Sequence, residues 1–216
     1  MKFDGIIDIA TGNNFQTKIW SNKKIEWSEL VDKLTTEHKT TETFKEYMSF
    51  DKAKQLAIKD VGGFVGGFLL NGKRHPQNVM HRQLITLDID EAIIDLWAEF
   101  KLQFNNAAVI HGTHKYTPEA PRYRLIMPIS REVSPEEYEA IARRVAGMIG
   151  INYFDNTTFQ VNRLMFWPST PKDINFYAEV QDGPWLDADK ILATYDDWHN
   201  VIEWPTNQKL QAVIAD

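Results

Sequence analysis

The sequence predicts an α+β fold, in which a mixed or antiparallel sheet is flanked by helices. Strand-like runs of apolar and β-branched residues are interleaved with amphipathic stretches along the 216 residues. Asn71-Gly72, between strand-like segments, is typical of a tight hairpin turn. Ser134-Pro135-Glu136-Glu137 combines a capping box with proline at the first helical position, so a helix begins there.

Each element is predicted from the spacing of its apolar residues. The strand-like stretches are bounded by turn-forming residues such as Thr11 to Asn14. The helical stretches carry apolar residues three and four positions apart, and Gly150 is a suitable stop for the helix that begins at Ser134. The threonine-rich residues 35–43 indicate an exposed loop. In chain order, strands are expected at residues 3–9, 15–20, 64–70, 83–90, 107–111, 122–129, 162–169 and 176–180, and helices at 28–34, 50–58, 91–104, 134–149 and 187–195.

A glycine-rich stretch, residues 62–67, has two interpretations. Four glycines in six residues let the backbone approach a ligand closely, or they serve a bulge or a strand crossing. Their spacing matches no phosphate-binding loop. The polar, basic residues 74–82 that follow are either a flap facing a substrate or a solvated connection.

Composition narrows the class of protein. The net charge of −6 gives no general basic character, so contact with nucleic acid would depend on a local basic cleft. Without cysteine the chain forms neither disulfides nor cysteine-based zinc sites, which suits a reducing cytosol. No apolar stretch approaches the length of a membrane span, and the N-terminus lacks a signal-peptide core. We therefore expect a soluble, cytoplasmic protein.

The central candidate site is the carboxylate pair Asp88 and Asp90, at the end of the predicted strand 83–90. Side chains two positions apart on a strand point to the same face, so these two carboxylates lie together. Close like charges repel unless a cation sits between them, and carboxylate oxygens suit Mg²⁺ or Mn²⁺. The alternative is that Asp90 caps the helix expected after it.

Further polar residues lie near the ends of other predicted strands. A set of carboxylates and cations of this kind is what nucleotidyl transfer needs. Divalent ions held by carboxylates activate the attacking hydroxyl group, while Arg, Lys and protonated His bind the triphosphate. The candidates are His114 and Lys115, Arg122 and Arg124, and Asp155 with Arg163.

The order of these motifs resembles the archaeo-eukaryotic primase superfamily, and more closely the primase-polymerase domains of phage and plasmid replication proteins. The first motif, hydrophobic-Asp-hydrophobic-Asp, is matched by residues 87–90; the second, small-x-His, by 112–114; and the third, hydrophobic-Asp, by 154–155. Residues 122–126 and 162–169 are similar to stretches of the phage branch. The resemblance covers roughly residues 60–170.

The resemblance implies a fold, an activity and roles. It implies a sheet of the RNA-recognition-motif type beside a smaller N-terminal α/β part, with a catalytic domain at 1–195, divided near residues 80 and 182, and a linker or extension at 196–216. It implies a primase or polymerase that extends primers on single-stranded DNA from nucleoside triphosphates with Mg²⁺ or Mn²⁺, beside a replicative helicase module, in a bacterial or phage-infected cell. Metal ligands would be Asp88, Asp90 and Asp155; nucleotide contacts would be His114, Arg163, Lys115, Arg122 and Arg124.

Simpler interpretations of single residues stay open. Asp155 is also placed to stabilise a turn with Thr157. His114 fits a half-buried, satisfied histidine, as does His111, and Arg122 has Glu119 as a surface partner. Two other functions remain open: a two-metal nuclease or nicking replication initiator, and a DNA-binding replication module without catalysis.

Overall fold

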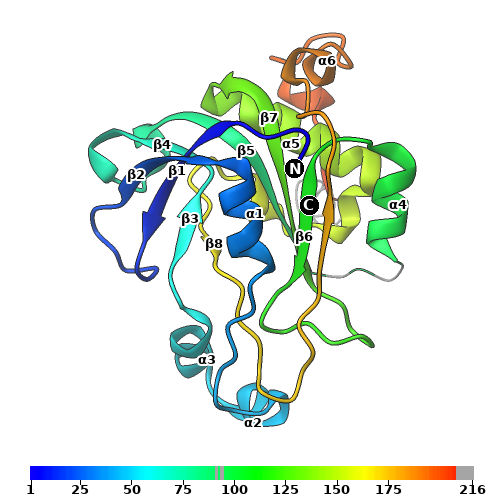
Figure 1. Ribbon diagram of the computed structural model, residues 1–216. Helices are drawn as coiled ribbons and strands as arrows, with labels where there is room; N and C mark the ends of the chain where they lie inside the picture. The colour runs from blue at the N-terminus through cyan, green and yellow to red at the C-terminus, as the bar shows by residue number, and fades with distance from the viewer. Residues whose placement is uncertain (91, 93–94, 208–216) are drawn as a thin grey trace, which may run out of the picture.

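Two antiparallel sheets form the centre of the protein, for which a computed structural model describes residues 1–90, 92 and 95–207 (Figure 1). The larger sheet has the strand order β4-β5-β7-β6-β9, and the smaller has the order β2-β1-β3-β8. Every pairing within the two sheets is antiparallel. The predicted α+β class is confirmed.

The strands of the two sheets come from both halves of the chain. They are β1 (Ile6–Gly12), β2 (Ser21–Glu26), β3 (Gly63–Val65), β4 (Gly67–Leu69), β5 (Val79–Ile89), β6 (Ala108–Gly112), β7 (Tyr123–Val133), β8 (Met165–Phe166) and β9 (Ala178–Gln181). The helices are α1 (Trp27–Thr35), α2 (Phe44–Ser49), α3 (Lys52–Lys59), α4 (Leu96–Gln103), α5 (Pro135–Ile149) and α6 (Ala188–Leu192). Among the described residues, none of these helices is long and apolar enough to span a membrane.

The larger sheet is covered on both faces, because residues alternate along β5, which lies between β4 and β7. Leu87 and its neighbours two positions away pack with α4, α5 and α6 in one core. Leu84 packs with α1, β1 and β3 in a second core. Asp88 falls on the Leu84 side of the pleat, at the end of the strand. The alternation therefore turns its carboxylate away from the α4–α5 core and into a cleft.

The glycine-rich stretch is where the chain crosses between the sheets. The single strand expected at 64–70 is wrong: β3 belongs to the smaller sheet and β4 to the larger. Gly66 stands between them, and a Cβ added there would lie 2.6 Å from the Cβ of Leu84. The carbonyl of Gly66 accepts from the backbone N–H of Gln83 and from the Arg82 side chain, both at 2.9 Å. This contact supports the strand-crossing interpretation of the glycines.

The turn at Asn71-Gly72 is present, but it does not form a two-residue hairpin. Both residues have positive φ, 55° and 64°, and the N–H of Lys73 bonds the carbonyl of Leu70 at 3.2 Å. These angles are those of a tight hairpin turn. The chain then makes a second short turn at Pro76–Asn78 before β5 begins, so the strands are joined by a longer loop.

Several predicted boundaries are wrong. Residues 15–20 form no strand, because Trp20 is buried and its N–H bonds the carbonyl of Gly72, and the partner of β1 is β2. Helix α2 was not expected. The strand expected at 162–169 is reduced to β8, which pairs with β3 in the smaller sheet.

The helix expected at 91–104 begins only at Leu96, and its N-cap is Asp95, which accepts from the N–H of Ala98. The alternative role of Asp90 as this N-cap is therefore wrong. Residues 91, 93 and 94 of that prediction, and 208–216 of the predicted extension at 196–216, lie outside the described residues.

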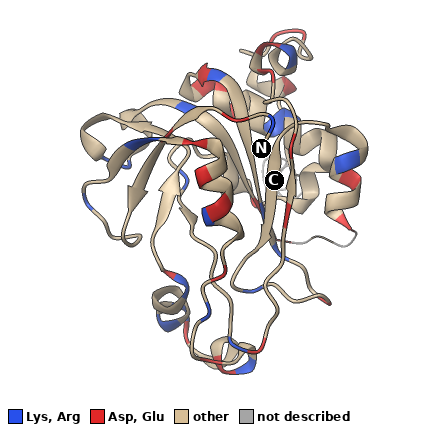
Figure 2. Cartoon of the chain, viewed as in Figure 1, with Lys and Arg blue, Asp and Glu red and all other residues tan. Residues whose placement is uncertain are grey.

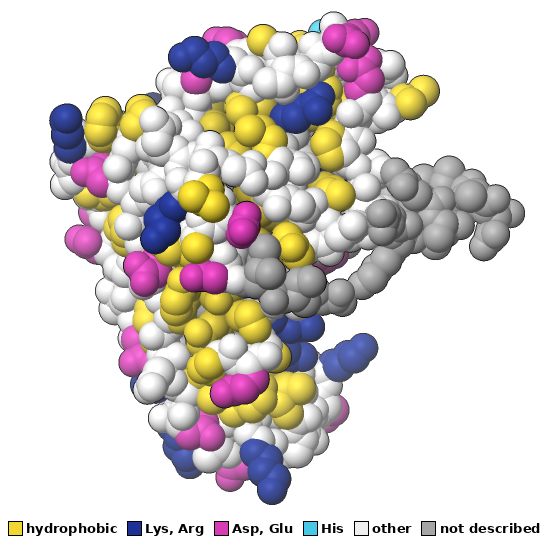
Figure 3. Space-filling model, turned by 90° about the vertical axis from the view of Figure 1, so that its right-hand side faces the viewer, with side chains coloured by type: hydrophobic (Ala, Val, Ile, Leu, Met, Phe, Trp, Pro, Cys, Tyr) yellow, Lys and Arg dark blue, Asp and Glu magenta, His cyan; other side chains and the backbone are white. Residues whose placement is uncertain are grey.

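Helices α2 and α3 extend from one end of the molecule, below both sheets in Figure 1. The loops that follow β8 and precede β9 run to the same end. Figure 3 shows the side that carries α4 and the β6–β7 connection, where hydrophobic and acidic side chains are interspersed. The division of the chain near residue 80 stays a prediction. In each sheet, one pair of strands joins the two sides of that boundary: β4 pairs with β5, and β3 pairs with β8.

Candidate active site

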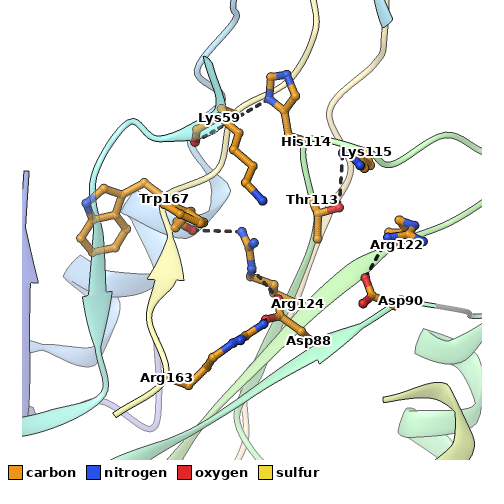
Figure 4. A pocket seen from close by; sticks show the side chains of 12 residues that line it. Lys59, Asp88, Asp90, Thr113, His114, Lys115, Arg122, Arg124, Arg163 and Trp167 are labelled. Atoms are coloured by element: carbon orange, nitrogen blue, oxygen red, sulfur yellow. Dashed lines mark hydrogen bonds and ion pairs between the residues drawn. The ribbon is translucent and has the colours of Figure 1, made fainter. Parts of the chain in front are cut away.

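A cleft of about 200 Å³ opens at the C-terminal end of β5, beside the start of β7 and the end of β6 (Figure 4). Seven of the eight predicted site residues line it; Asp155 lies beside it and shares a second pocket with Asp90. The structure therefore brings together residues that are far apart in the chain. The lining residues are Lys59, Asp88, Asp90, Thr113, His114, Lys115, Arg122, Arg124, Arg163, Phe166, Trp167 and Ser169.

Asp88 is 8% exposed and is held by two guanidinium groups. Its Oδ1 accepts from Nε of Arg124 at 2.8 Å, and its Oδ2 from Nη2 of Arg163 at 3.0 Å. Burial raises the pKa of the Asp88 carboxyl, but the two arginines lower that pKa by more, so it lies below its ordinary value. Asp88 is therefore an ionised carboxylate at neutral pH.

Asp155 shares Arg163 with Asp88. Nη2 of Arg163 lies 3.1 Å from Oδ2 of Asp155, and the backbone N–H of Asp155 donates to the carbonyl of Asp88 at 3.3 Å. Asp155 also accepts from the backbone N–H and the hydroxyl of Thr157, at 3.0 and 2.6 Å. Its turn-stabilising role is thus confirmed, and the same geometry points the carboxylate at Arg163.

Asp90 lies at the rim of the cleft and pairs with Arg122. Nη1 of Arg122 donates to Oδ1 of Asp90 at 3.0 Å, with both side chains partly exposed. The surface pair expected between Arg122 and Glu119 is not the ion pair that forms. Arg122 and Arg124 line the same cleft, as the predicted strand 122–129 implies, although β7 begins only at Tyr123.

His114 is 4% exposed, and both of its ring nitrogens are engaged. Nδ1 lies 2.9 Å from the hydroxyl of Ser169, and Nε2 lies 3.1 Å from Oε1 of Glu42. The ring of Tyr47 packs against it, with centroids 4.4 Å apart. Burial lowers the pKa of His114, and Glu42 opposes that effect without reversing it. In this arrangement His114 has no ring nitrogen left for a phosphate.

His111 is fully buried and only half satisfied. Its Nδ1 bonds the carbonyl of Gly112 at 2.9 Å, and its Nε2 has no partner among the described residues. Burial lowers the pKa of this imidazole to about 3. The ring is neutral at physiological pH, with Nδ1 carrying the proton. The prediction of a half-buried, satisfied histidine is therefore wrong on both points: the ring is fully buried, and one of its nitrogens has no partner among the described residues.

The cleft is cationic although the protein is acidic. Lysine and arginine are spread along the chain and mixed with aspartate and glutamate (Figure 2). In the lining of the cleft, cations outnumber carboxylates, against a net charge of −6 for the chain. Such a local excess attracts a polyanion. The cations are Lys59, Lys115, Arg122, Arg124 and Arg163, and the carboxylates are Asp88 and Asp90.

The carboxylates fit a hard divalent cation by their chemistry. The carboxylates of Asp88 and Asp155 both accept from Nη2 of Arg163, so one cationic atom lies between two carboxylate oxygens. That is the position in which carboxylates hold Mg²⁺ or Mn²⁺. Arg163 already supplies a positive charge there, so a divalent ion would compete with its guanidinium.

A separate group of potential ligands lies at the other end of β5. Among the described residues, Asp8, His81 and Glu132 have ligand atoms within 4.8 Å of one another. Nε2 of His81 lies 3.0 Å from Asp8, and Nδ1 lies 3.5 Å from Glu132. Nζ of Lys24 lies 3.7 Å from the same oxygen of Asp8. These polar contacts, of which the one between His81 and Asp8 is a hydrogen bond, already account for the group.

Some residues of the cleft had no signal in the sequence. Lys59 ends a short helix that is distant in the chain, and Glu42 lies in the loop expected to be exposed. Trp167 was expected to belong to the core. It is among the residues that line the cleft, and its ring stacks on Phe64 with ring centroids 4.8 Å apart. Only the fold brings these side chains to the motifs.

Comparisons with known proteins give two findings. Residues 1–207 match the family model described as the VapE N-terminal domain. Among solved structures, the AEP domain of the primase-polymerase of cyanophage S-2L matches with a TM-score of 0.46 and 10% sequence identity, covering 87% of this chain and 88% of that one. No curated protein matches the sequence.

Proposed function

The chain belongs to the VapE N-terminal domain family, and from that premise we propose that it is a template-dependent nucleotidyltransferase. It acts as a DNA primase, a DNA polymerase or both, and makes or extends primers on single-stranded DNA. One observation carries the proposal: the carboxylates of Asp88 and Asp155 flank a single cationic nitrogen beside a cleft rich in lysine and arginine. Carboxylates for metal beside cations for phosphate are what nucleotidyl transfer needs.

In the reaction, the 3′-hydroxyl of the primer gives its proton to solvent and attacks the α-phosphate. A new P–O bond forms, the bond from the α-phosphorus to the bridging oxygen breaks, and pyrophosphate leaves with the electrons of that bond. Mg²⁺ or Mn²⁺, when bound by Asp88, Asp90 and Asp155, supplies the charge that activates the hydroxyl and stabilises the leaving group. Arg124 orients Asp88 through the 2.8 Å hydrogen bond and keeps its carboxylate ionised. These contacts preorganise the carboxylates before a substrate arrives.

The cations at the rim bind the triphosphate. Lys115 has no ion-pair partner among the described residues, so its ammonium is available. Arg122 and Arg163 are partly exposed, and each is held by a carboxylate that a divalent ion would also claim. If these carboxylates held a divalent ion, the guanidinium groups of Arg122 and Arg163 would be free to bind phosphate oxygens. His114 joins them only if Glu42 gives up its hydrogen bond.

The partners follow from this activity. The template is single-stranded DNA, the substrates are nucleoside triphosphates, and a replicative helicase module, in the same chain or another, is the expected partner. The site of action is the cytoplasm of a bacterial or phage-infected cell. Residues 1–195 make up the catalytic domain, and residues 196–216 form a linker or C-terminal extension.

The decisive test is a primer-extension and de novo synthesis assay with ribo- and deoxynucleotides, in Mg²⁺ and in Mn²⁺. Incorporation that is lost in Asp88→Asn and needs a template supports the proposal. Cleavage of a labelled oligonucleotide without nucleotides would favour a nuclease instead. Binding of DNA that is indifferent to divalent ions and to nucleotides, with no synthesis, would indicate a module without catalysis.

A further inference from the structure

Lys59 is a cation of the cleft that comes from outside the motif-bearing segment. It is the last residue of α3, and its side chain reaches into the cleft toward Arg124 (Figure 4). Its Nζ lies 5.2 Å from the centroid of the Phe166 ring. The end of a helix near the N-terminus of the chain thus supplies one wall of the site.

The arginines of the cleft are paired, whereas Lys59 is not. Each of Arg122, Arg124 and Arg163 lies within 3.0 Å of a carboxylate oxygen. Among the described residues, no carboxylate lies within 4.0 Å of Nζ of Lys59. The aromatic ring of Phe166 gives only a weak contact at that distance.

The position of Lys59 in the cleft is unfavourable for its charged ammonium group as long as no anion is bound. Burial lowers the pKa of Lys59, and Arg124, Lys115 and Arg163 lower it further, against the attraction of Asp88. Asp88 is already neutralised by two guanidinium groups. An anion entering the cleft would remove this penalty, and a phosphate chain carries several charges that Lys59 can share with its neighbours.

We propose that Lys59 binds the phosphate chain of the incoming nucleoside triphosphate, which makes the end of α3 part of the nucleotide site. The inference rests on the proposed function for the identity of the ligand. It rests on the cleft itself for the binding of a polyphosphate. Because His114 is occupied by Glu42 and Ser169, Lys59 and Lys115 are the cations first available to that chain.

Sodium tripolyphosphate is the probe, since it presents the charges of the substrate without base or sugar. Calorimetric titration of the whole chain should show binding that Lys59→Ala weakens by about tenfold, the effect of losing one charge-assisted hydrogen bond. Lys59→Arg should retain most of it. Lys52→Ala removes the same charge from an exposed position of the same helix and should leave affinity unchanged.

Two results would overturn the proposal: equal affinity of the wild type and Lys59→Ala, or no binding of tripolyphosphate by the wild type. Melting temperatures of all variants separate loss of binding from loss of folding, and Lys59→Gln replaces the alanine variant if that one does not fold. Lys59-dependent binding of tripolyphosphate without primer extension would refute the proposed function and leave the anion site intact. Primer extension by the wild type, together with equal affinities of the wild type and Lys59→Ala for tripolyphosphate, would refute the role of Lys59 and support the proposed function.

Discussion

The carboxylates of Asp88 and Asp155 meet at one nitrogen atom, Nη2 of Arg163, which lies 3.0 Å from the first and 3.1 Å from the second. The backbone places them there, because the N–H of Asp155 bonds the carbonyl of Asp88. Two like charges are thereby held together by a third side chain of opposite charge. The arrangement stabilises the cleft when no metal is bound. A divalent ion that binds these carboxylates would have to displace the guanidinium group of Arg163.

Asp88→Asn should abolish nucleotide incorporation, because a neutral amide is a poor ligand for a divalent ion. It should also lower the free energy of unfolding by about 3 kcal/mol, since Arg124 and Arg163 lose a buried counter-charge. Primer extension and urea unfolding measure the two effects. Asp32→Asn, an exposed position of α1, is the control and should change neither. Full activity in Asp88→Asn would refute the assignment.

Arg163→Ala should bind Mn²⁺ several-fold more tightly than the wild type in the absence of nucleotide. The guanidinium that bridges Asp88 and Asp155 is then gone, and a cation no longer has to displace it. Incorporation should nevertheless fall, because a phosphate contact is lost. Electron paramagnetic resonance of free Mn²⁺ reports the affinity. Weaker Mn²⁺ binding in the variant would show that Arg163 does not compete for the site.

The stability of the protein should decrease as the pH falls from about 6.5, through His111. Its pKa is lowered to about 3 in the folded state from an ordinary 6.5, because the ring is buried. The unfolded chain therefore takes up a proton that the folded chain refuses, which removes up to about 4 kcal/mol by pH 3.

Urea unfolding of the wild type and His111→Asn between pH 7.5 and about 4.5 tests this expectation. The stability is fully present above pH 6.5 and is lost as the pH falls, so the wild type should show the steeper slope. Parallel slopes for the two proteins would contradict it.

Glu42→Gln should lower the pKa of His114 further below its ordinary value. Burial already lowers that pKa, and the charge of Glu42 and its hydrogen bond are what oppose the effect. Following the ring signals of His114 by NMR through a pH titration measures the shift. Glu37→Gln, a neighbouring position that pairs with Lys39, should leave the titration unchanged. An upward shift in Glu42→Gln would show that the contact is not the one described.

Local patterns in the sequence anticipated much of the fold. Helix α5 begins at Ser134, whose side chain accepts from the N–H of Glu137, and ends at Gly150 with a φ of 137°. Both signals are local, since a cap and a left-handed residue act within one turn of the helix. Asp88 and Asp90, and Arg122 and Arg124, line one cleft as their spacing predicted, although Asp90 and Arg122 lie one residue outside β5 and β7. The strand ends were less well predicted, because β3 and β8 contain three and two residues and are defined by their partners.

By itself, the sequence determined the α+β class and the caps of helix α5. It also determined that Asp88 lies with Asp90, and Arg122 with Arg124, because those features depend on neighbours a few positions away. Tertiary structure alone decided that β4 joins the larger sheet and β8 the smaller one. It also decided that Arg163 bridges Asp88 and Asp155, and that the carboxylate of Glu42 contacts Nε2 of His114. It also brought Lys59 into the cleft, where no carboxylate of the described residues forms an ion pair with it. Charges and hydrogen bonds act over a few ångströms in space, and which distant segments come that close is set by how the two cores pack.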